Sequence, residues 1–301
     1  MTTLNLFAAR QLESISAKVQ LKKYPEFKQR FFFPVNFEVN ASAETYTYYF
    51  LEEIGTAKII ADYSKDWGRI SLKSQSFTAK IKGIGSEYGW NFQEARAAQM
   101  ANMPLSDTEA MGARRANSQE ERDIAFFGND EYGLTGLFNH PSVPSGTATN
   151  DGTAGATTFA SKTPAQILRD LNACANDIVT DTKEVEIPDT MLMPTAQYTL
   201  IASTPYSDSI ATSILKMFLE SNPYIKNVFP CEQCNAVDAF SGDDVMVAYR
   251  RAEDVLRLIV PQDFEQLPEL MGPVRWNIKA HQRCGGLEIR LPLAINIVRG
   301  I

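Results

Sequence analysis

The chain has 301 residues, of which 44% are hydrophobic and 22% are charged, and its formal net charge at pH 7 is −7. This length allows one large domain or two modest ones, and the composition is that of a globular protein rather than a collagen-like or disordered one. The negative charge argues against a surface that grips nucleic acid through its phosphates, because such surfaces concentrate Lys and Arg.

Targeting and membrane segments are not expected. The first residues, MTTLNLFAARQLES, lack a basic stretch followed by an apolar run, and no apolar stretch approaches the ~20 residues that a membrane helix needs. The four cysteines are too few for a disulfide framework in a chain of this length. We therefore expect a protein made in a reducing cytoplasm, with no membrane partner.

The first 50 residues predict a helix followed by strands. Apolar residues recur at intervals of three to five positions over 4–21, which predicts a short amphipathic helix. Val35, Phe37 and Val39 then alternate with polar residues, and Tyr46, Tyr48 and Phe50 alternate with Thr45, Thr47 and Tyr49. Both patterns predict strands.

Residues 58–85 predict a long β-hairpin. Two β-favouring stretches, 58–63 and 77–84, flank a polar middle that contains Trp67. Large apolar residues are few in this segment, and lysines occur along its whole length: Lys58, Lys65, Lys73, Lys80 and Lys82. Because an isolated two-stranded hairpin is only marginally stable in water, we expect contacts outside its own subunit to hold it.

Two helices are expected next, over 91–103 and 106–127, with Pro104 between them. Ser106 and Glu109 have the spacing of a capping box, which predicts that the second helix begins there. Its roughly twenty residues would span about 30 Å. One face carries only a few apolar residues, so we expect a long helix with modest contact to the core. Gly128 is the expected C-terminal stop, because glycine adopts the left-handed conformation without a Cβ clash.

The glycine-rich stretch FFGNDEYGLTGLFNHP, 126–141, predicts a change of chain direction. Gly133 and Gly136 are expected to turn the chain, and Leu137 and Phe138 to begin a buried strand that ends at Asn139-His140-Pro141. A phosphate-binding loop is disfavoured, because these glycines follow a helix C-terminus, where the partial charge is negative.

The second half of the chain predicts alternating helices and strands. A Gly, Ser, Thr and Ala loop over 145–161 precedes a helix over 163–179, with Thr163 as its cap and Pro164 in its first turn. A strand-like segment over 190–203, a helix over 207–221 and strands over 245–251 and 255–261 follow. The last segment, 287–298, is expected to return as a strand to the domain formed by earlier residues. The pattern indicates an α+β fold.

In this order, several segments resemble one family. A hairpin, the entry GSEYGWNFQEA, a long charged helix, ERDIAFFGNDEYGLTGLFNHPSVP and the C-terminal RCGGLEIRLPLAINIVRGI are similar to major capsid proteins of tailed bacteriophages with the Hong Kong 97-type fold, including an encapsulin-like branch. The resemblance covers almost the whole chain. It implies an N-terminal arm (1–43), an extended hairpin loop (44–89), a peripheral domain with a long spine helix (90–160 and 272–301) and an axial α+β domain (161–271).

The resemblance also implies a structural function. A major capsid protein self-assembles, as hexamers and pentamers of copies of itself, into an icosahedral phage head that encloses double-stranded DNA. We expect a separate scaffolding protein and a portal as partners, DNA held without sequence-specific binding, and location in the virion after assembly in the host cytoplasm. The alternative within the same fold is an encapsulin-like nanocompartment shell.

An enzyme is the alternative from another class. Cys231 and Cys234 form a CxxC, and His281 and Cys284 form an HxxC, so together they have the soft ligands of a zinc site. Because the two pairs fall in different proposed domains, packed and reduced cysteines are the preferred interpretation. His140 beside Pro141 is expected to cap a turn. We therefore predict no enzymatic activity and no catalytic, cofactor-binding or metal-binding residues.

Overall fold

The computed structural model describes residues 24–59, 67–101, 105–207, 210–272 and 274–301. The helix expected over 4–21 lies outside these residues.

The α-helices are α1 Gln29–Phe32, α2 Phe92–Ala101, α3 Leu105–Phe127, α4 Pro164–Asp181, α5 Thr195–Ser203 and α6 Ile214–Ser221. The strands are β1 Val35–Asn36, β2 Thr45–Gly55, β3 Ile70–Lys80, β4 Lys82–Asn91, β5 Ser145–Thr147, β6 Thr190–Met193, β7 Pro205–Ser207, β8 Ile210–Ser213, β9 Asn227–Pro230, β10 Val245–Tyr249, β11 Leu256–Ile259, β12 Gln262–Gln266, β13 Leu270–Met271, β14 Arg275–Cys284, β15 Leu287–Ile289 and β16 Ile295–Arg299.

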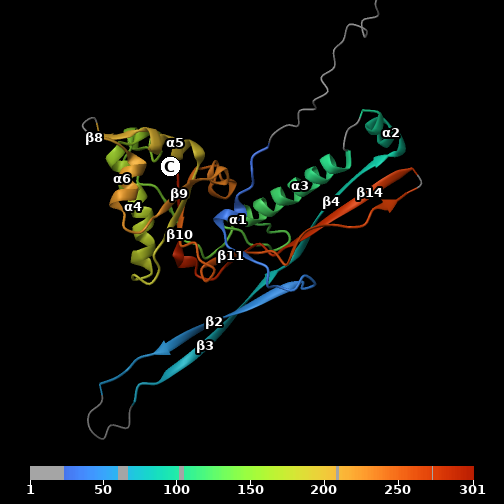
Figure 1. Cartoon of the computed structure of the whole chain (residues 1–301). Coiled ribbons are helices and arrows are strands. Elements are labelled where there is room, and N and C mark those ends of the chain that lie inside the picture. The colour runs from blue at the N-terminus through green and yellow to red at the C-terminus, as the bar shows by residue number, and fades with distance from the viewer. Residues whose placement is uncertain (1–23, 60–66, 102–104, 208–209, 273) are drawn as a thin grey trace, which may run out of the picture.

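Three parts of the molecule extend in different directions (Figure 1). Helices α4, α5 and α6 gather around the sheet that contains β9 and β10. Helix α3 runs outward from this body beside the long strands β4 and β14. The hairpin of β2 and β3 projects away from both. The chain is therefore an α+β fold with a long, separate arm.

A five-stranded sheet, ordered β5-β16-β10-β6-β9, separates two hydrophobic cores. Side chains alternate along β10: Val245, Val247 and Tyr249 join the core on the side of α3, whereas Met246 and Ala248 join the core formed with α4 and α6. This alternation follows from the two-residue period of a strand. All five residues of β10 are fully buried, so the central strand anchors both halves of the body.

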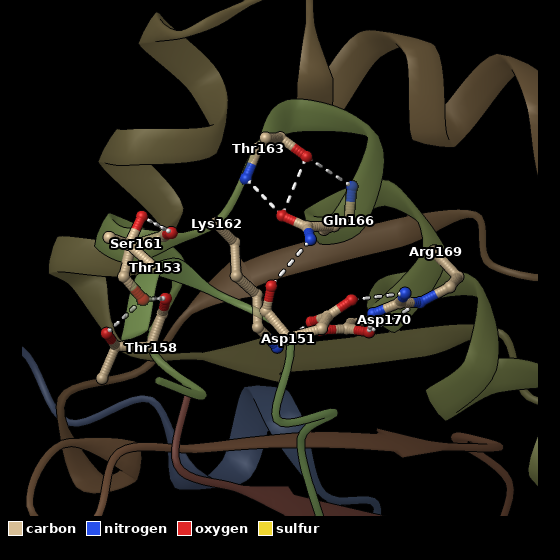
Figure 2. A network of polar contacts seen from close by, with 9 residues as sticks. All are labelled: Asp151, Thr153, Thr158, Ser161, Lys162, Thr163, Gln166, Arg169 and Asp170. Atoms are coloured by element: carbon tan, nitrogen blue, oxygen red, sulfur yellow. Dashed lines mark hydrogen bonds and ion pairs between the residues drawn. The ribbon is translucent and has the colours of Figure 1, made fainter. Parts of the chain in front are cut away.

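Helix α4 begins as predicted. The Thr163 side chain accepts a hydrogen bond from the backbone N–H of Gln166, and the Gln166 side chain accepts one from the Thr163 backbone, which completes a capping box. Figure 2 shows that Gln166 also donates to the Asp151 carbonyl, at 2.8 Å. The cap therefore ties the preceding loop to the helix.

Ion pairs complete the attachment of this loop (Figure 2). The ammonium group of Lys162, which is fully buried, contacts the buried carboxylate of Asp170. Arg169 pairs with Asp170 at 2.7 Å and with Asp151 at 2.6 Å. The hydrogen bond from Arg169 holds the pKa of Asp151 below its usual value.

Helix α3 packs against β4 and extends outward from the body of the subunit (Figure 1). Its 23 residues span about 35 Å at the usual rise per residue. Strand β4 pairs with β14 over ten residues, from Lys82 opposite Cys284 to Asn91 opposite Arg275. Strands β4 and β14 and helix α3 together form one long, narrow part of the molecule.

The glycine-rich stretch redirects the chain as expected, although it forms no strand. Gly128 ends α3 with φ +67°, and Asn129 and Leu134 form an isolated bridge around Gly133, which has φ +68°. Leu137 and Phe138 are buried, but their backbone N–H groups bond back to Ala125 and Phe126 in the last turn of α3 rather than to a strand. The predicted strand at this point is wrong because the end of the helix supplies the acceptors.

The predicted hairpin has the wrong partner strands. Strand β3 pairs with β2 in an unbroken antiparallel register, from Gly55 opposite Ile70 to Thr45 opposite Lys80. Residues 58 and 59 lie outside any strand, 60–66 are not among the described residues, and the expected strand 77–84 is divided between β3 and β4 at Ile81. The hairpin therefore uses 45–55, of which the sequence predicts 45–50 as a separate strand.

Other boundaries also differ from expectation. The strand expected around Val35 to Val39 is only β1, preceded by α1. Helix α3 already begins at Leu105, so Ser106 is not its cap. The segment 190–203 is a strand followed by a helix, with Pro194 between β6 and α5, and 207–221 contains β8 before α6. Strand β16 joins the five-stranded sheet between β5 and β10, beside strands of the proposed axial domain, whereas β14 pairs with β4.

Candidate assembly surface

The hairpin of β2 and β3 has two different halves. At its base, the rings of Tyr46, Tyr48 and Phe77 stack in succession, with centroids 6.2 and 5.5 Å apart. These residues lie on one face, because Tyr48 is directly opposite Phe77 in the register. The Tyr48 hydroxyl also donates to the Ile289 carbonyl at 3.5 Å, which joins the stack to the rest of the subunit.

A charged cluster under the stack positions it. Glu288, whose side chain is fully buried, pairs with Arg257 at 2.7 Å and with Arg290 at 2.8 Å. Arg257 also donates to the Tyr46 hydroxyl at 2.8 Å, and the guanidinium of Arg290 lies 5.6 Å from the centre of the Tyr48 ring. The buried carboxylate of Glu288 therefore holds two arginines in place, and these arginines contact the tyrosines at the base of the hairpin.

The outer half of the hairpin exposes large apolar side chains. Tyr49 is 73% exposed and Ile70 is 71% exposed, and the group also contains Phe50, Leu51, Ile54 and Leu72. Trp67, between the two strands, is exposed as well. The strands form a two-stranded sheet of their own. An apolar surface on an arm without a core of its own is typical of an interaction site.

A second charged cluster fixes the arm that precedes the hairpin. Glu121, on α3, is buried and accepts hydrogen bonds from Arg30 at 2.7 and 2.8 Å, and from Gln29 at 3.2 Å. Gln282 of β14 also donates to this carboxylate. Arg30 reaches Asp263 at 2.8 Å, and this bond lowers the pKa of Asp263. One carboxylate therefore joins α1, α3 and β14.

Sequence reasoning missed both carboxylates. Glu121 was part of a charged helix face, and Glu288 lies between two apolar residues at the end of the chain. A charged residue between Leu287 and Ile289 in a strand is a weak signal of an inward carboxylate, but its two arginine partners are not identifiable without the fold.

The four cysteines are buried free thiols, and the proposed zinc ligands do not form a site. Among the described residues, which include Cys231, Cys234, His281 and Cys284, no group of three or more His, Cys, Asp or Glu side chains could hold a metal ion. Burial raises the pKa of the Cys174 and Cys284 thiols to about 12 and that of Cys234 well above its ordinary value. Thiols in this state are poor metal ligands and poor nucleophiles.

No helix in the described part of the chain has the length and apolar character needed to cross a membrane.

Comparisons with known proteins agree with this architecture. A family model described as major capsid protein matches residues 55–301. The capsid of Myoviridae phage XM1 superposes with a TM-score of 0.85 at 16% identity, covering 98% of this chain and 99% of that one. A Mycobacterium phage Ogopogo structure gives a TM-score of 0.66 at 10% identity, covering 97% of each chain. A virus-like particle from Pyrococcus furiosus gives 0.54 at 12% identity, covering 89% of this chain and 90% of that one. No curated protein matches the sequence.

A long helix beside the sheet that contains β4 and β14, a separate α+β body and a projecting hairpin define a shell-forming subunit with the Hong Kong 97-type fold, which confirms the predicted fold class. The chain belongs to the major capsid protein family. It is a structural protein of the icosahedral phage head, as its sequence predicted, and its place is the virion.

Proposed function

We propose that this subunit builds the phage head through its hairpin, which lies across a neighbouring copy within hexamers and pentamers. The shell encloses double-stranded DNA, with a separate scaffolding protein and a portal as partners, and it assembles in the host cytoplasm. The match to the major capsid protein family over residues 55–301 favours the phage head over the encapsulin-like compartment.

The observation that carries this proposal is the exposed outer half of the hairpin. Tyr49, Leu51, Ile70 and Leu72 are all more than 60% exposed on a two-stranded arm, where nothing in the arm itself can bury them. Burial of such side chains is worth about 1.5–3 kcal/mol each, so a partner that covers them gains a large part of a stable interface.

The same proposal assigns a role to each part of the chain. Residues 1–43 act as an N-terminal arm and 44–89 as the extended loop. Residues 90–160 with 272–301 act as the peripheral domain and 161–271 as the axial domain. The role is structural rather than enzymatic, and the buried cysteines serve packing.

Shortening the hairpin tests the proposal. Replacement of residues 49–76 by a short Gly-Ser turn keeps the anchoring pair of Tyr48 and Phe77 and removes the exposed half. We expect a folded subunit whose thermal unfolding is close to that of the parent, but no closed particles. Normal assembly of this variant, or its failure to fold, would contradict the proposal.

Trp67→Ala is the matching point variant. A large exposed aromatic in the segment between the strands is a candidate hot spot for a neighbour's pocket. We expect particle yield to fall while the unfolding temperature of the subunit stays unchanged.

A further inference from the structure

A fully buried lysine lies between two carboxylates beside helix α4 (Figure 2). The Lys162 ammonium contacts the carboxylate of Asp170, and neither side chain is more than 2% exposed. The carboxylate of Asp151 has its Oδ1 atom 3.7 Å from the same lysine nitrogen. This Oδ1 atom is buried and has no hydrogen-bond partner among the described residues. An amine, a carboxyl group and a second carboxylate are therefore enclosed together.

Burial makes the ionised state of this pair costly. An ammonium group and a carboxylate both lose strong hydration inside a protein, and their mutual attraction does not always repay that loss. Transfer of one proton from Lys162 to Asp170 leaves a neutral amine in contact with a carboxylic acid. Because burial disfavours charged groups, this transfer costs less here than in water. A neutral amine is a nucleophile, and the carboxyl carbon of Asp170 is one bond away from the oxygen that it contacts.

Arg169 is placed to stabilise attack by that amine. Its Nε and Nη2 groups donate to Oδ1 of Asp170 at 3.2 and 2.7 Å, whereas Lys162 contacts Oδ2. The two oxygens of this carboxylate therefore have different partners. The guanidinium would hold the negative charge that develops on Oδ1 during the attack, as donors do in an oxyanion hole. Oδ2 is the oxygen that can leave.

Asp151 is placed to move a proton. The Nη1 group of Arg169 donates to Oδ2 of Asp151 at 2.6 Å, which favours the ionised carboxylate and leaves its Oδ1 atom beside the lysine. Once the amine has attacked, this Oδ1 atom can take a proton from the nitrogen and pass it to the departing oxygen of Asp170. The three groups around Lys162 therefore have the positions that formation of an amide bond requires.

We propose that Lys162 and Asp170 join in an amide bond within one subunit, with Asp151 as the proton acceptor and Arg169 as the donor to the oxyanion. The Lys162 nitrogen bonds to the carboxyl carbon of Asp170, the bond from that carbon to Oδ2 breaks, and one water molecule leaves. The carboxylate supplies the oxygen of this water, and the ammonium group supplies both hydrogens. The balance needs no oxidant, reductant or further reactant. Contact between the two groups in the folded chain removes the entropic cost of bringing them together.

The bond fixes the segment 148–162 to helix α4. This segment leads from β5, at the edge of the five-stranded sheet, to α4, which packs against β16 and β10 of the same sheet. An amide bond keeps this attachment in acid and in high salt, both of which weaken an ion pair. The reaction occurs once in each chain, so it is not an enzymatic turnover. It is independent of the hairpin, and its failure would leave the proposed function unchanged.

The intact mass of the purified full-length protein tests the proposal. After denaturation and reduction, the chain should weigh one water molecule less than its sequence. Lys162→Gln should have the full mass of its own sequence. Asp151→Asn keeps the amine and the carboxyl group but removes the proton acceptor, and it should lower the reacted fraction at least about tenfold. A parent chain with its full sequence mass would show an ion pair only and would overturn the proposal. An equal reacted fraction in Asp151→Asn would overturn the role of Asp151.

Digestion with trypsin locates the bond. Cleavage after unmodified lysine and arginine separates the peptides 123–162, 163–169 and 170–183. A bond between Lys162 and Asp170 blocks cleavage after Lys162 and gives 123–169 joined to 170–183. A bond between Lys162 and Asp151 blocks the same cleavage but leaves 170–183 free. The second pattern would overturn the assignment of Asp170 as the partner.

Discussion

At the residue scale, single buried carboxylates hold together segments that are far apart in the chain. Glu121 receives hydrogen bonds from residues of α1 and β14, and Glu288 receives two arginines beneath the hairpin. A buried carboxylate is stable only when its partners are present, so each cluster fixes a particular arrangement of its segments.

Removal of Glu121 should therefore destabilise the subunit strongly. Glu121→Ala leaves Gln29, Arg30 and Gln282 without their shared acceptor, and we expect the free energy of unfolding to fall by about 2–3 kcal/mol. Glu120→Ala, at the exposed neighbouring position, should change it by less than about 0.5 kcal/mol. Urea denaturation of both variants measures the difference, and equal effects would show that the cluster does not hold the arm.

His140 should make stability depend on pH. Burial lowers its pKa below the ordinary value of 6.5, and the backbone N–H of Ser142 donates to its Nδ1 at 3.3 Å, which requires the neutral ring. The unfolded chain thus binds a proton near pH 6.5, and the folded chain binds it only at lower pH. The contribution is complete above pH 6.5 and is lost as the pH falls from there through the lowered pKa.

Comparison with a non-titrating variant measures this effect. Between about pH 7.5 and about pH 5.5, the unfolding temperature of the parent should fall more than that of His140→Gln. A parallel fall in the parent and in His140→Gln would contradict the assignment.

At the element scale, the end of α3 and the turn after it form one packed unit. A Cβ added at Gly136 would lie 2.4 Å from the backbone nitrogen of Gly128, and the Gly136 N–H donates to the Asn139 side chain at 2.7 Å. The glycines therefore allow backbone to pack on backbone, which agrees with an architectural rather than a phosphate-binding function.

Two alanine substitutions separate packing from helix propensity. Gly136→Ala should lower the free energy of unfolding by about 1–3 kcal/mol, because backbone atoms must move. Gly112→Ala, on α3, meets nothing within 4 Å and should raise it by up to about 1 kcal/mol. Thermal unfolding of the pair decides, and a stabilising Gly136→Ala would show that the close approach is absent.

The sequence predicted those elements whose signals are local. The cap at Thr163 and the stop at Gly128 each depend on a few neighbouring residues, and both are confirmed. The hairpin partners were wrong because pairing depends on which strand the chain brings alongside, and residues 45–55 and 58–63 both favour strand. Glu121 and Glu288 were missed because Arg30 and Arg257 lie far from them in the sequence, although Arg290, the second partner of Glu288, is only two residues away.

At the scale of the whole molecule, the subunit is a shell component whose net charge is −7. A subunit of this charge offers few phosphate contacts, and the affinity of a protein for DNA depends on salt in proportion to the number of such contacts. Confinement of DNA by a closed wall needs no strong binding by each subunit.

Free subunits should accordingly bind DNA weakly and without sequence preference. Fluorescence anisotropy with a labelled duplex should show a shallow dependence of affinity on salt, and the same result for duplexes of unrelated sequence. Nanomolar binding to one defined sequence at physiological salt would contradict a purely confining shell.

The central claim is that this chain builds a shell, and electron microscopy of the purified full-length protein tests it most directly. The protein should be expressed alone and with the proposed scaffolding protein, and negatively stained at micromolar concentration. We predict closed particles or hexameric and pentameric capsomers, because the hairpin exposes apolar surface that only neighbouring copies can cover. A monomer that forms no particles under either condition would contradict the account.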